Sequence, residues 1–320
     1  MKKWLLIMYA CMLVLGVATV ATVMFIDKGQ QTDEKKVDKE NKKIIPEIVK
    51  PKEIELPIAD KNDLQLKLKS KEVLLFDLTD EKVIFAKNAD QKAFPASLTK
   101  MMTVLVAIEE IDNLHTKVTV PASIFPYITN ANASVAGFQP NEQVEAKDLL
   151  YGVMLPSGAD ASLALALHVS GNEKDFVKLM NQKAKTLGMN NTKFKNVEGL
   201  HDHQHYTTAH DLMKLVQYAV KNPSYRKIFE AKQHTVASTS YRAQGLSFKS
   251  SMFSKLDMTK KRNFILLGGK TGYTPESGLS LASLASKNGK EYAAIVLNAP
   301  GTNRTEQFNI LDTLKLYKAM

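Results

Sequence analysis

The sequence has a single cysteine, Cys11, among 320 residues, so no disulfide can form within the chain. It has neither a G-x-x-x-x-G-K-[S/T] nor a G-x-G-x-x-G motif, which leaves nucleotide chemistry without support. The net charge of +10 suits an anionic partner such as nucleic acid, lipid or a cell-wall polymer. Because no stripe of aromatic and basic residues is present, we do not expect nucleic-acid binding.

Charged residues are absent from one long stretch near the N-terminus. Residues 4–26 carry none, and two lysines precede them. As a helix they would rise about 34 Å, which is enough to cross a bilayer. The apolar region of a cleavable signal peptide is usually shorter. We therefore expect a cytoplasmic stub at 1–3 and a transmembrane anchor at 4–26, with the remainder outside the cell. The alternative is a cleaved signal peptide, which would give a secreted protein.

Residues 27–61 lack any apolar period. They hold nine lysines, nine acidic residues and three prolines, a composition typical of disordered chain. This segment is predicted to be a charged tether. The folded part is then expected to be one domain over residues 62–320.

The domain contains apolar patterns of both helical and strand type. Residues 73–77 and 83–86 are expected to form a hairpin, and late strands are expected at 264–267, 279–285 and 292–297. Helices are expected at 98–111, 144–151, 159–169, 176–187, from Thr207 or Thr208 to about 220, and at 308–317. Strands at both ends with helices between them predict an α+β fold whose sheet joins the two ends of the chain.

The stretch Ser97-Leu98-Thr99-Lys100 places a hydroxyl and an amine about one helical turn apart. A serine becomes nucleophilic when a base lies beside it, and a lysine with a lowered pKa can be that base. This spacing also arises by chance. Ser224 and Lys227 have it too, and we give that pair no weight.

Two further motifs carry polar groups suited to binding. Lys270-Thr271-Gly272 lies among glycines before a strand pattern, so it indicates a strand edge that another segment approaches closely. Its lysine and threonine could hold a carboxylate, and an ordinary loop is the alternative. Ser157-Gly158 lies in a loop between two predicted helices, where a side chain can face a binding site.

The order of S-x-x-K, a central serine motif and K-T-G is typical of penicillin-binding proteins and class A β-lactamases. Long blocks such as FPASLTKMMTVLVAIE, DLLYGVMLPSGADASLALA and GGKTGYTPESGLSLASLA resemble the D-alanyl-D-alanine carboxypeptidases of the S11 serine peptidase type. The resemblance covers about residues 64–316. It implies a β-lactamase/transpeptidase-like fold, with an antiparallel sheet packed with helices and a helical subdomain.

The resemblance also implies a reaction. In this family a serine attacks the penultimate D-alanine carbonyl of a peptidoglycan stem pentapeptide, the terminal D-alanine leaves, and water hydrolyses the acyl-enzyme. It assigns catalytic roles to Ser97, Lys100 and Ser157, and substrate binding to Lys270, Thr271, Gly272, Tyr273 and Arg304. The oxyanion hole would be the N–H groups of Ser97 and Tyr273. β-Lactam antibiotics would be ligands, and no cofactor or metal is expected.

The sequence departs from the family at three places. The family has an asparagine where this chain has Ala159, residues 234–262 match loosely, and the resemblance ends without a second β-rich domain. We therefore expect the N-terminal span to provide membrane attachment. Alternatives to a carboxypeptidase are a catalytically weak wall-binding module and a related endopeptidase or β-lactamase.

Histidines cluster in His201-Asp202-His203-Gln204-His205, with His210 nearby. Imidazole and carboxylate groups in such combinations can hold zinc. Because the family has a polar loop at this place, we expect a solvated loop and no metal.

Overall fold

The computed structural model describes residues 64–320. The predicted anchor at 4–26 and the tether at 27–61 lie outside the described residues. From residue 64 onward, no helix has the length and apolar character needed to cross a bilayer.

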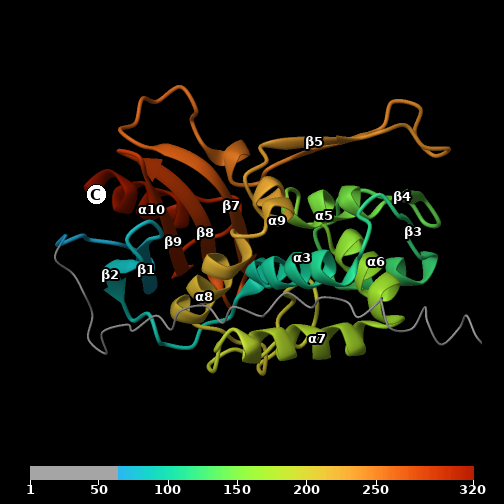
Figure 1. Cartoon of the computed structure of the whole chain (residues 1–320), viewed down its shortest axis with the longest axis horizontal. Coiled ribbons are helices and arrows are strands. Elements are labelled where there is room, and N and C mark those ends of the chain that lie inside the picture. The colour runs from blue at the N-terminus through green and yellow to red at the C-terminus, as the bar shows by residue number, and fades with distance from the viewer. Residues whose placement is uncertain (1–63) are drawn as a thin grey trace, which may run out of the picture. The chain divides into compact units, whose positions relative to one another are not determined.

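A five-stranded antiparallel sheet forms one part of the domain (Figure 1). Its strands, in spatial order, are β2 (Lys82–Lys87), β1 (Glu72–Asp77), β9 (Lys290–Ala299), β8 (Gly278–Lys287) and β7 (Ile265–Thr274). Every neighbouring pair is antiparallel. Because β1 pairs directly with β9, the sheet joins the early and late parts of the chain, which confirms the predicted α+β architecture.

Both faces of the sheet are buried, and β1 shows how its sequence achieves this. Successive side chains of a strand point to opposite faces. Leu74 and Phe76 belong to the larger core, which holds the central helices, whereas Val73 and Leu75 belong to a smaller core beneath the last helix. All four are at most 2% exposed. An apolar run without alternation is what a strand covered on both faces requires.

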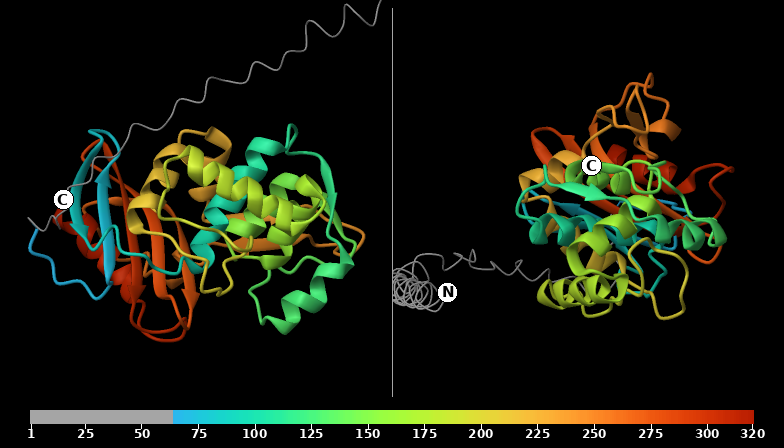
Figure 2. Two further views of the ribbon diagram at one scale, coloured as in Figure 1. Left: turned by 90° about the horizontal axis from the view of Figure 1, so that it is seen from below. Right: turned by 90° about the vertical axis from the view of Figure 1, so that its right-hand side faces the viewer.

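Eight helices lie among residues 64–320, some packed on the sheet and the others packed on one another beside it. They are α3 (Thr99–Glu110), α4 (Phe125–Asn130), α5 (Ala146–Met154), α6 (Ala159–Ser170), α7 (Glu173–Thr186), α8 (Ala209–Ala219), α9 (Pro223–Phe229) and α10 (Phe308–Ala319). The last helix, α10, packs on one face of the sheet through β8 and β9, and α8 packs on the other through β1 and β9 (Figure 2). Helix α3 contacts α5, α6 and α7, so it is the centre of the helical subdomain.

Two small sheets and three short 3-10 turns complete the domain. The small sheets pair β3 (Lys117–Thr119) with β4 (Gln143–Glu145), and β5 (Gln233–Val236) with β6 (Leu246–Lys249). The turns are η1 (Ala96–Leu98), η2 (Ala122–Ile124) and η3 (Phe253–Lys255). The sheet of β5 and β6 occupies the stretch that resembles the family loosely.

The predicted elements differ from the observed ones mainly at their ends. Val144 was expected to begin a helix but lies in β4, and α5 begins at Ala146. The strand expected at 264–267 continues to Thr274 as β7. It can do so because β8 supplies a paired partner along the glycine-rich part, with Thr271 opposite Leu281. Pairing to a neighbour outweighs the low intrinsic strand propensity of glycine.

Candidate active site

The centre of the site is the turn that leads into α3. Pro95 precedes η1, in which Ser97 is half-buried, and Lys100 lies in the first turn of α3. The Lys100 ammonium Nζ donates to Ser97 Oγ at 3.4 Å. Ala96 has a φ of +47°, which is a strained conformation for a residue with a Cβ. The structure thus brings the predicted nucleophile and base together on one strained turn.

Lys100 is buried, with 3% of its surface exposed. Its Nζ donates a short hydrogen bond to the backbone carbonyl of Glu198. Burial lowers the pKa of Lys100 from 10.5 to about 8, although the negative charges of Glu198 and Asp160 oppose the shift. Burial disfavours the charged amine, so about a tenth of Lys100 is neutral at pH 7, and a neutral amine beside Ser97 Oγ could accept its proton.

A second lysine lies on β7. Lys270 has no exposed surface, and its Nζ donates to Ser157 Oγ at 2.9 Å and to the Thr271 carbonyl at 2.8 Å. Burial lowers its pKa well below the usual value, and the charges of Lys100 and Lys255 add to the effect. The structure therefore joins the central serine motif to the K-T-G motif by a direct contact.

Ser157 is held in a strained backbone conformation. Its φ is +69°, in the left-handed region that favours glycine. The residue lies in the connection between α5 and α6, one position before the N-cap Gly158, and it is 8% exposed. Such strain persists where the surrounding structure fixes it, which is common at functional sites.

β7 is an edge strand, and η1 lies against it. A Cβ built on Gly272 would lie 3.1 Å from the Pro95 carbonyl oxygen, so a side chain there would push the strand from the turn. Thr271 and Tyr273, on either side of this glycine, are half-buried. The Thr271 hydroxyl is 2.6 Å from that of Ser251, a partner that the sequence analysis missed.

Gly199 is a second contact that sequence reasoning missed. It has a φ of +85°, and a Cβ built there would lie 1.9 Å from the Ala96 carbonyl oxygen and 2.9 Å from the Ser97 nitrogen. Only glycine allows this approach. The VEGL stretch was visible in the sequence, but its proximity to residues 95–100, the candidate catalytic turn, depends on tertiary packing.

Asp160 fixes the loop beside Ser157. Its buried carboxylate accepts backbone N–H bonds from Ala136, Gly137 and Phe138 at 2.7, 2.8 and 3.1 Å. Ala159 precedes it and is 1% exposed. A carboxylate that accepts three backbone bonds is well compensated for burial, so this loop is rigidly attached to the start of α6.

Glu198 belongs to a buried acidic cluster behind Lys100. Its Oε1 accepts from the Tyr127 hydroxyl at 2.6 Å. Burial and the neighbouring charge of Glu198 raise the pKa of Glu173 from 4.5 to about 7. The cluster therefore places negative charge near the ammonium of Lys100, which limits how far burial lowers its pKa.

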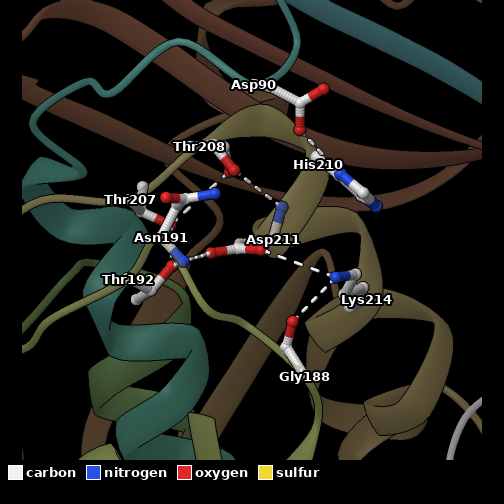
Figure 3. A network of polar contacts seen from close by, with 9 residues as sticks. All are labelled: Asp90, Gly188, Asn191, Thr192, Thr207, Thr208, His210, Asp211 and Lys214. Carbon is white, nitrogen blue, oxygen red and sulfur yellow. Dashed lines mark hydrogen bonds and ion pairs between the residues drawn. The ribbon is translucent and has the colours of Figure 1, made fainter. Parts of the chain in front are cut away.

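A polar network joins the start of α8 to the segment 188–192 (Figure 3). Ala93 and Thr207 exchange backbone hydrogen bonds of 2.8 and 2.9 Å, while Thr208 accepts from the Asp211 N–H and caps α8. The Thr207 hydroxyl is 2.8 Å from that of Thr192. The segment before Pro95 is thus held at Ala93 by Thr207, whose hydroxyl is in turn held by Thr192.

The expectation of a solvated histidine loop is wrong for His205. This residue is 2% exposed, and its Nε2 lies 2.8 Å from Thr99 Oγ1. Burial lowers its pKa from 6.5 to about 4, so it is neutral. The loop folds over the start of α3, and the ring of His201 packs edge-on against Phe94. In residues 64–320, no group of three or more metal-ligating side chains is placed to hold an ion.

Arg304 is not brought into this constellation. It lies between β9 and α10 and is exposed. Its backbone N–H donates to the Thr302 hydroxyl at 3.2 Å, and no contact of its guanidinium with Lys270 or Thr271 is present among the residues described. Its role in binding a carboxylate stays a prediction.

Comparisons with known proteins agree with this geometry. The family model of D-alanyl-D-alanine carboxypeptidase, peptidase S11, matches residues 59–301. The D-alanyl-D-alanine carboxypeptidase DacF of Bacillus subtilis (strain 168) is 32% identical over 241 residues, which are 75% of this chain and 60% of the relative. The D-alanyl-D-alanine endopeptidase of Escherichia coli (strain K12) is 30% identical, and the match covers 74% of each chain.

A solved structure has a similar fold. The Streptomyces K15 DD-transpeptidase is similar with a TM-score of 0.72 and 27% identity, over 79% of this chain and 97% of that chain. The chain spans about 60% of the length of DacF. The residues that the family model matches, 59–301, contain all three motifs.

Proposed function

The chain belongs to the D-alanyl-D-alanine carboxypeptidase family, peptidase S11, and on that premise we propose that it removes the terminal D-alanine from peptidoglycan stem pentapeptides. The observation that carries the proposal is the buried Lys100 amine beside Ser97 Oγ, with its pKa lowered to about 8. The same site would bind β-lactam antibiotics, whose reactive carbonyl offers Ser97 an equivalent target.

In the proposed first step, Ser97 Oγ attacks the carbonyl carbon of the penultimate D-alanine. The hydroxyl proton passes to the neutral Lys100 amine, which already lies within contact of Oγ. The backbone N–H groups of Ser97 and Tyr273 would stabilise the oxyanion. Removing one such donor typically costs about 3 kcal/mol of transition-state stabilisation.

Collapse of the tetrahedral intermediate breaks the peptide C–N bond. The leaving amine of D-alanine needs a proton, and Ser157 would relay it, because its hydroxyl contacts the Lys270 amine. Water then attacks the acyl-serine ester and releases the shortened peptide, with the reverse proton transfers at Ser97 and Lys100.

The terminal carboxylate would bind at the K-T-G motif. The Thr271 hydroxyl can donate to it, and Gly272 allows the peptide to approach the strand edge. Lys270 has a lowered pKa in the free protein, and a bound carboxylate would favour its charged form. Arg304 would add positive charge if its loop moved toward the ligand.

The test uses the full chain in detergent with a fluorescent penicillin and, separately, a stem pentapeptide. We expect covalent labelling at Ser97 by peptide mass mapping and release of D-alanine. Ser97→Ala should abolish both. Ser224→Ala is the matched control, since Ser224 and Lys227 have the same spacing on α9. Labelling that survives Ser97→Ala would refute the assignment.

Endopeptidase activity is a second candidate, because one relative named an endopeptidase matches over 74% of its own length. A cross-linked stem dimer distinguishes the two. Hydrolysis of the dimer at a rate that equals or exceeds that of the pentapeptide would favour an endopeptidase. Labelling by penicillin without turnover of either substrate would favour a wall-binding module.

We further propose attachment to the cell membrane by residues 4–26, with the catalytic domain outside the cell. The support is the uncharged apolar run after two lysines. Intact mass of protein purified from membranes tests it. A mature chain that begins between about residues 22 and 32 would mean that a signal peptide is removed and the protein secreted.

A further inference from the structure

A groove of 620 Å³ runs along α7 and lies apart from the catalytic serine and lysines. One wall is α7, and the other is the segment 193–195. Val177 and the buried ring of Phe194 contribute apolar surface to its floor. In Figure 1, α7 lies on the far side of α3 from β5 and β6.

Five lysines line this groove. Lys174, Lys178 and Lys185 are exposed and occupy one face of α7, since spacings of four and seven residues return to the same face. Lys193 and Lys195 are exposed on the opposite wall. Phe194 between them is buried, so exposed and buried side chains alternate, as expected of an extended segment. Positive charge is thus presented from both sides.

Little negative charge compensates these lysines. The side-chain ammonium groups of Lys193 and Lys195 both approach one neutral oxygen, Gln204 Oε1, at 3.2 and 3.3 Å. Lys178 pairs with Asp175 at 2.6 Å, but the two side chains are 62% and 47% exposed, and an ion pair in contact with solvent contributes little. Among the lining residues Glu173 alone is acidic, and its pKa is raised to about 7.

The two walls are fixed relative to each other. The Asn181 side chain donates to the Phe194 carbonyl and accepts from the Phe194 N–H, each at 2.9 Å. Behind the groove, the buried Asp211 carboxylate accepts from Asn191 N–H and Thr192 hydroxyl at 2.8 Å (Figure 3). The convergence of like charges is therefore built into the fold and is not an accident of mobile side chains.

We propose that this groove binds a linear polyanion whose charges are phosphodiesters. Lysine ammonium groups recognise phosphate as point charges, and a row of them on two walls suits a chain of regularly spaced anions. An anionic bilayer is a poorer match, since the surface is concave. The exposed large apolar side chains of the described domain also lie outside α7 and 193–195.

A single-stranded nucleic acid is also a poorer match. Such strands bind through aromatic platforms on which bases stack, and the one aromatic ring that lines the groove, Phe194, is buried. A phosphodiester polymer without bases needs only the cations. Binding of this kind would keep the domain close to an anionic polymer of the cell envelope while its catalytic turn faces another ligand.

The test titrates the full chain in detergent with a fluorescent glycerol phosphate oligomer of about ten units. The variant is Lys185→Gln/Lys193→Gln/Lys195→Gln. The control is Lys227→Gln/Lys260→Gln/Lys318→Gln, which makes the same change in net charge at exposed positions outside the groove. We expect the variant to bind the oligomer at least about tenfold more weakly. The slope of log Kd against the logarithm of the salt concentration should fall by about two, because binding displaces fewer counterions.

The control should bind within about twofold of the parent. Equal weakening of both triple variants would mean that net charge alone attracts the oligomer, which overturns the proposal. Mixed micelles of phosphatidylglycerol provide the second arm. If they displace the oligomer at equal phosphate concentration, the groove binds a lipid headgroup instead. Penicillin labelling of Ser97 should be unchanged in both variants, so this result is independent of the proposed activity.

Discussion

At the scale of single residues, the proposed reaction depends on the protonation state of Lys100. A base must be neutral to accept a proton, and the buried position of this amine lowers its pKa to about 8. The carbonyl of Glu198 accepts one of its hydrogens. The neutral amine can therefore keep that bond and still direct its lone pair toward Ser97 Oγ.

A pH profile tests this arrangement. The rate of Ser97 acylation by penicillin should rise about tenfold per pH unit below pH 8 and level off above it, because the neutral fraction of Lys100 follows that course. Stopped-flow fluorescence between pH 6 and 9.5 measures it. Lys100→Arg, which stays charged throughout this range, should be inactive at every pH. A flat profile for the parent would show that Lys100 is not the base.

Ala159 gives a second prediction at this scale. An asparagine could hydrogen-bond the substrate and Lys100, and a bond to a charged group contributes roughly 1.5–3 kcal/mol. Ala159→Asn should therefore raise kcat/KM for D-alanine release by about tenfold or more. Ala159→Leu has nearly the same shape without polar atoms and should give no gain. Because Ala159 is 1% exposed, thermal unfolding must show that both variants fold. Equal changes of kcat/KM in Ala159→Asn and Ala159→Leu would mean that the volume of the side chain, and not its hydrogen bonding, determines the rate.

At the scale of elements, the position of η1 depends on two glycines that let the backbone pass closely. Gly199 meets the carbonyl of Ala96, and Gly272 meets that of Pro95. The catalytic turn is thus enclosed between the loop before His201 and the edge strand β7. In both places the nearest atom is a backbone carbonyl oxygen, which cannot move aside as a flexible side chain could.

Substitution of Gly199 tests this enclosure. Gly199→Ala should slow acylation of Ser97 at least about tenfold, because its Cβ would displace the Ala96 carbonyl and with it the Ser97 nitrogen. Gly171→Ala is the matched control: its φ is +72°, but no atom lies within 4 Å of the added Cβ. Gly171→Ala should lose about 1–2 kcal/mol of stability from the strained backbone, and Gly199→Ala should lose more, because its Cβ also overlaps the Ala96 carbonyl. Only Gly199→Ala should lose acylation rate, and equal rates would contradict the argument.

At the scale of the whole molecule, Asp312 on α10 joins the beginning of the described domain to its end. Its buried Oδ2 accepts from the backbone N–H groups of Lys69 and Ser70, each at 2.7 Å, and from the Ser70 hydroxyl at 2.9 Å. These residues are more than 240 positions apart in sequence. The contact fastens the segment that enters β1 to α10.

Asp312→Ala should lower the free energy of unfolding by about 3 kcal/mol, because several buried donors lose their acceptor. Urea unfolding followed by circular dichroism measures the change. Asp257→Ala is the control, since Asp257 also accepts two hydrogen bonds but is exposed and local. It should change stability little. Similar losses for both would indicate that Asp312 does not connect the ends.

The sequence alone determined the longer elements and the identities of the reactive groups, but it did not predict α4, α9 or the strands β3 to β6. Apolar periodicity predicted the ends of α3, α6, α8 and α10 within a few residues. Each of these helices either buries one apolar face or is buried on all faces, and both cases leave a readable pattern in the sequence. The spacing of Ser97 and Lys100 fixed their contact, since both belong to the same turn. These features are local, and local sequence is sufficient to specify them.

Only the tertiary structure decided what surrounds those groups. Glu198, Asp160 and Gly199 act on the site across tens of residues of sequence, and the lowered pKa of Lys100 arises from burial that no local pattern encodes. The same holds for the cationic groove, whose lysines come from a helix and a separate extended segment. Packing brings such groups together, and burial and charge then depend on distances in space rather than on separation along the chain.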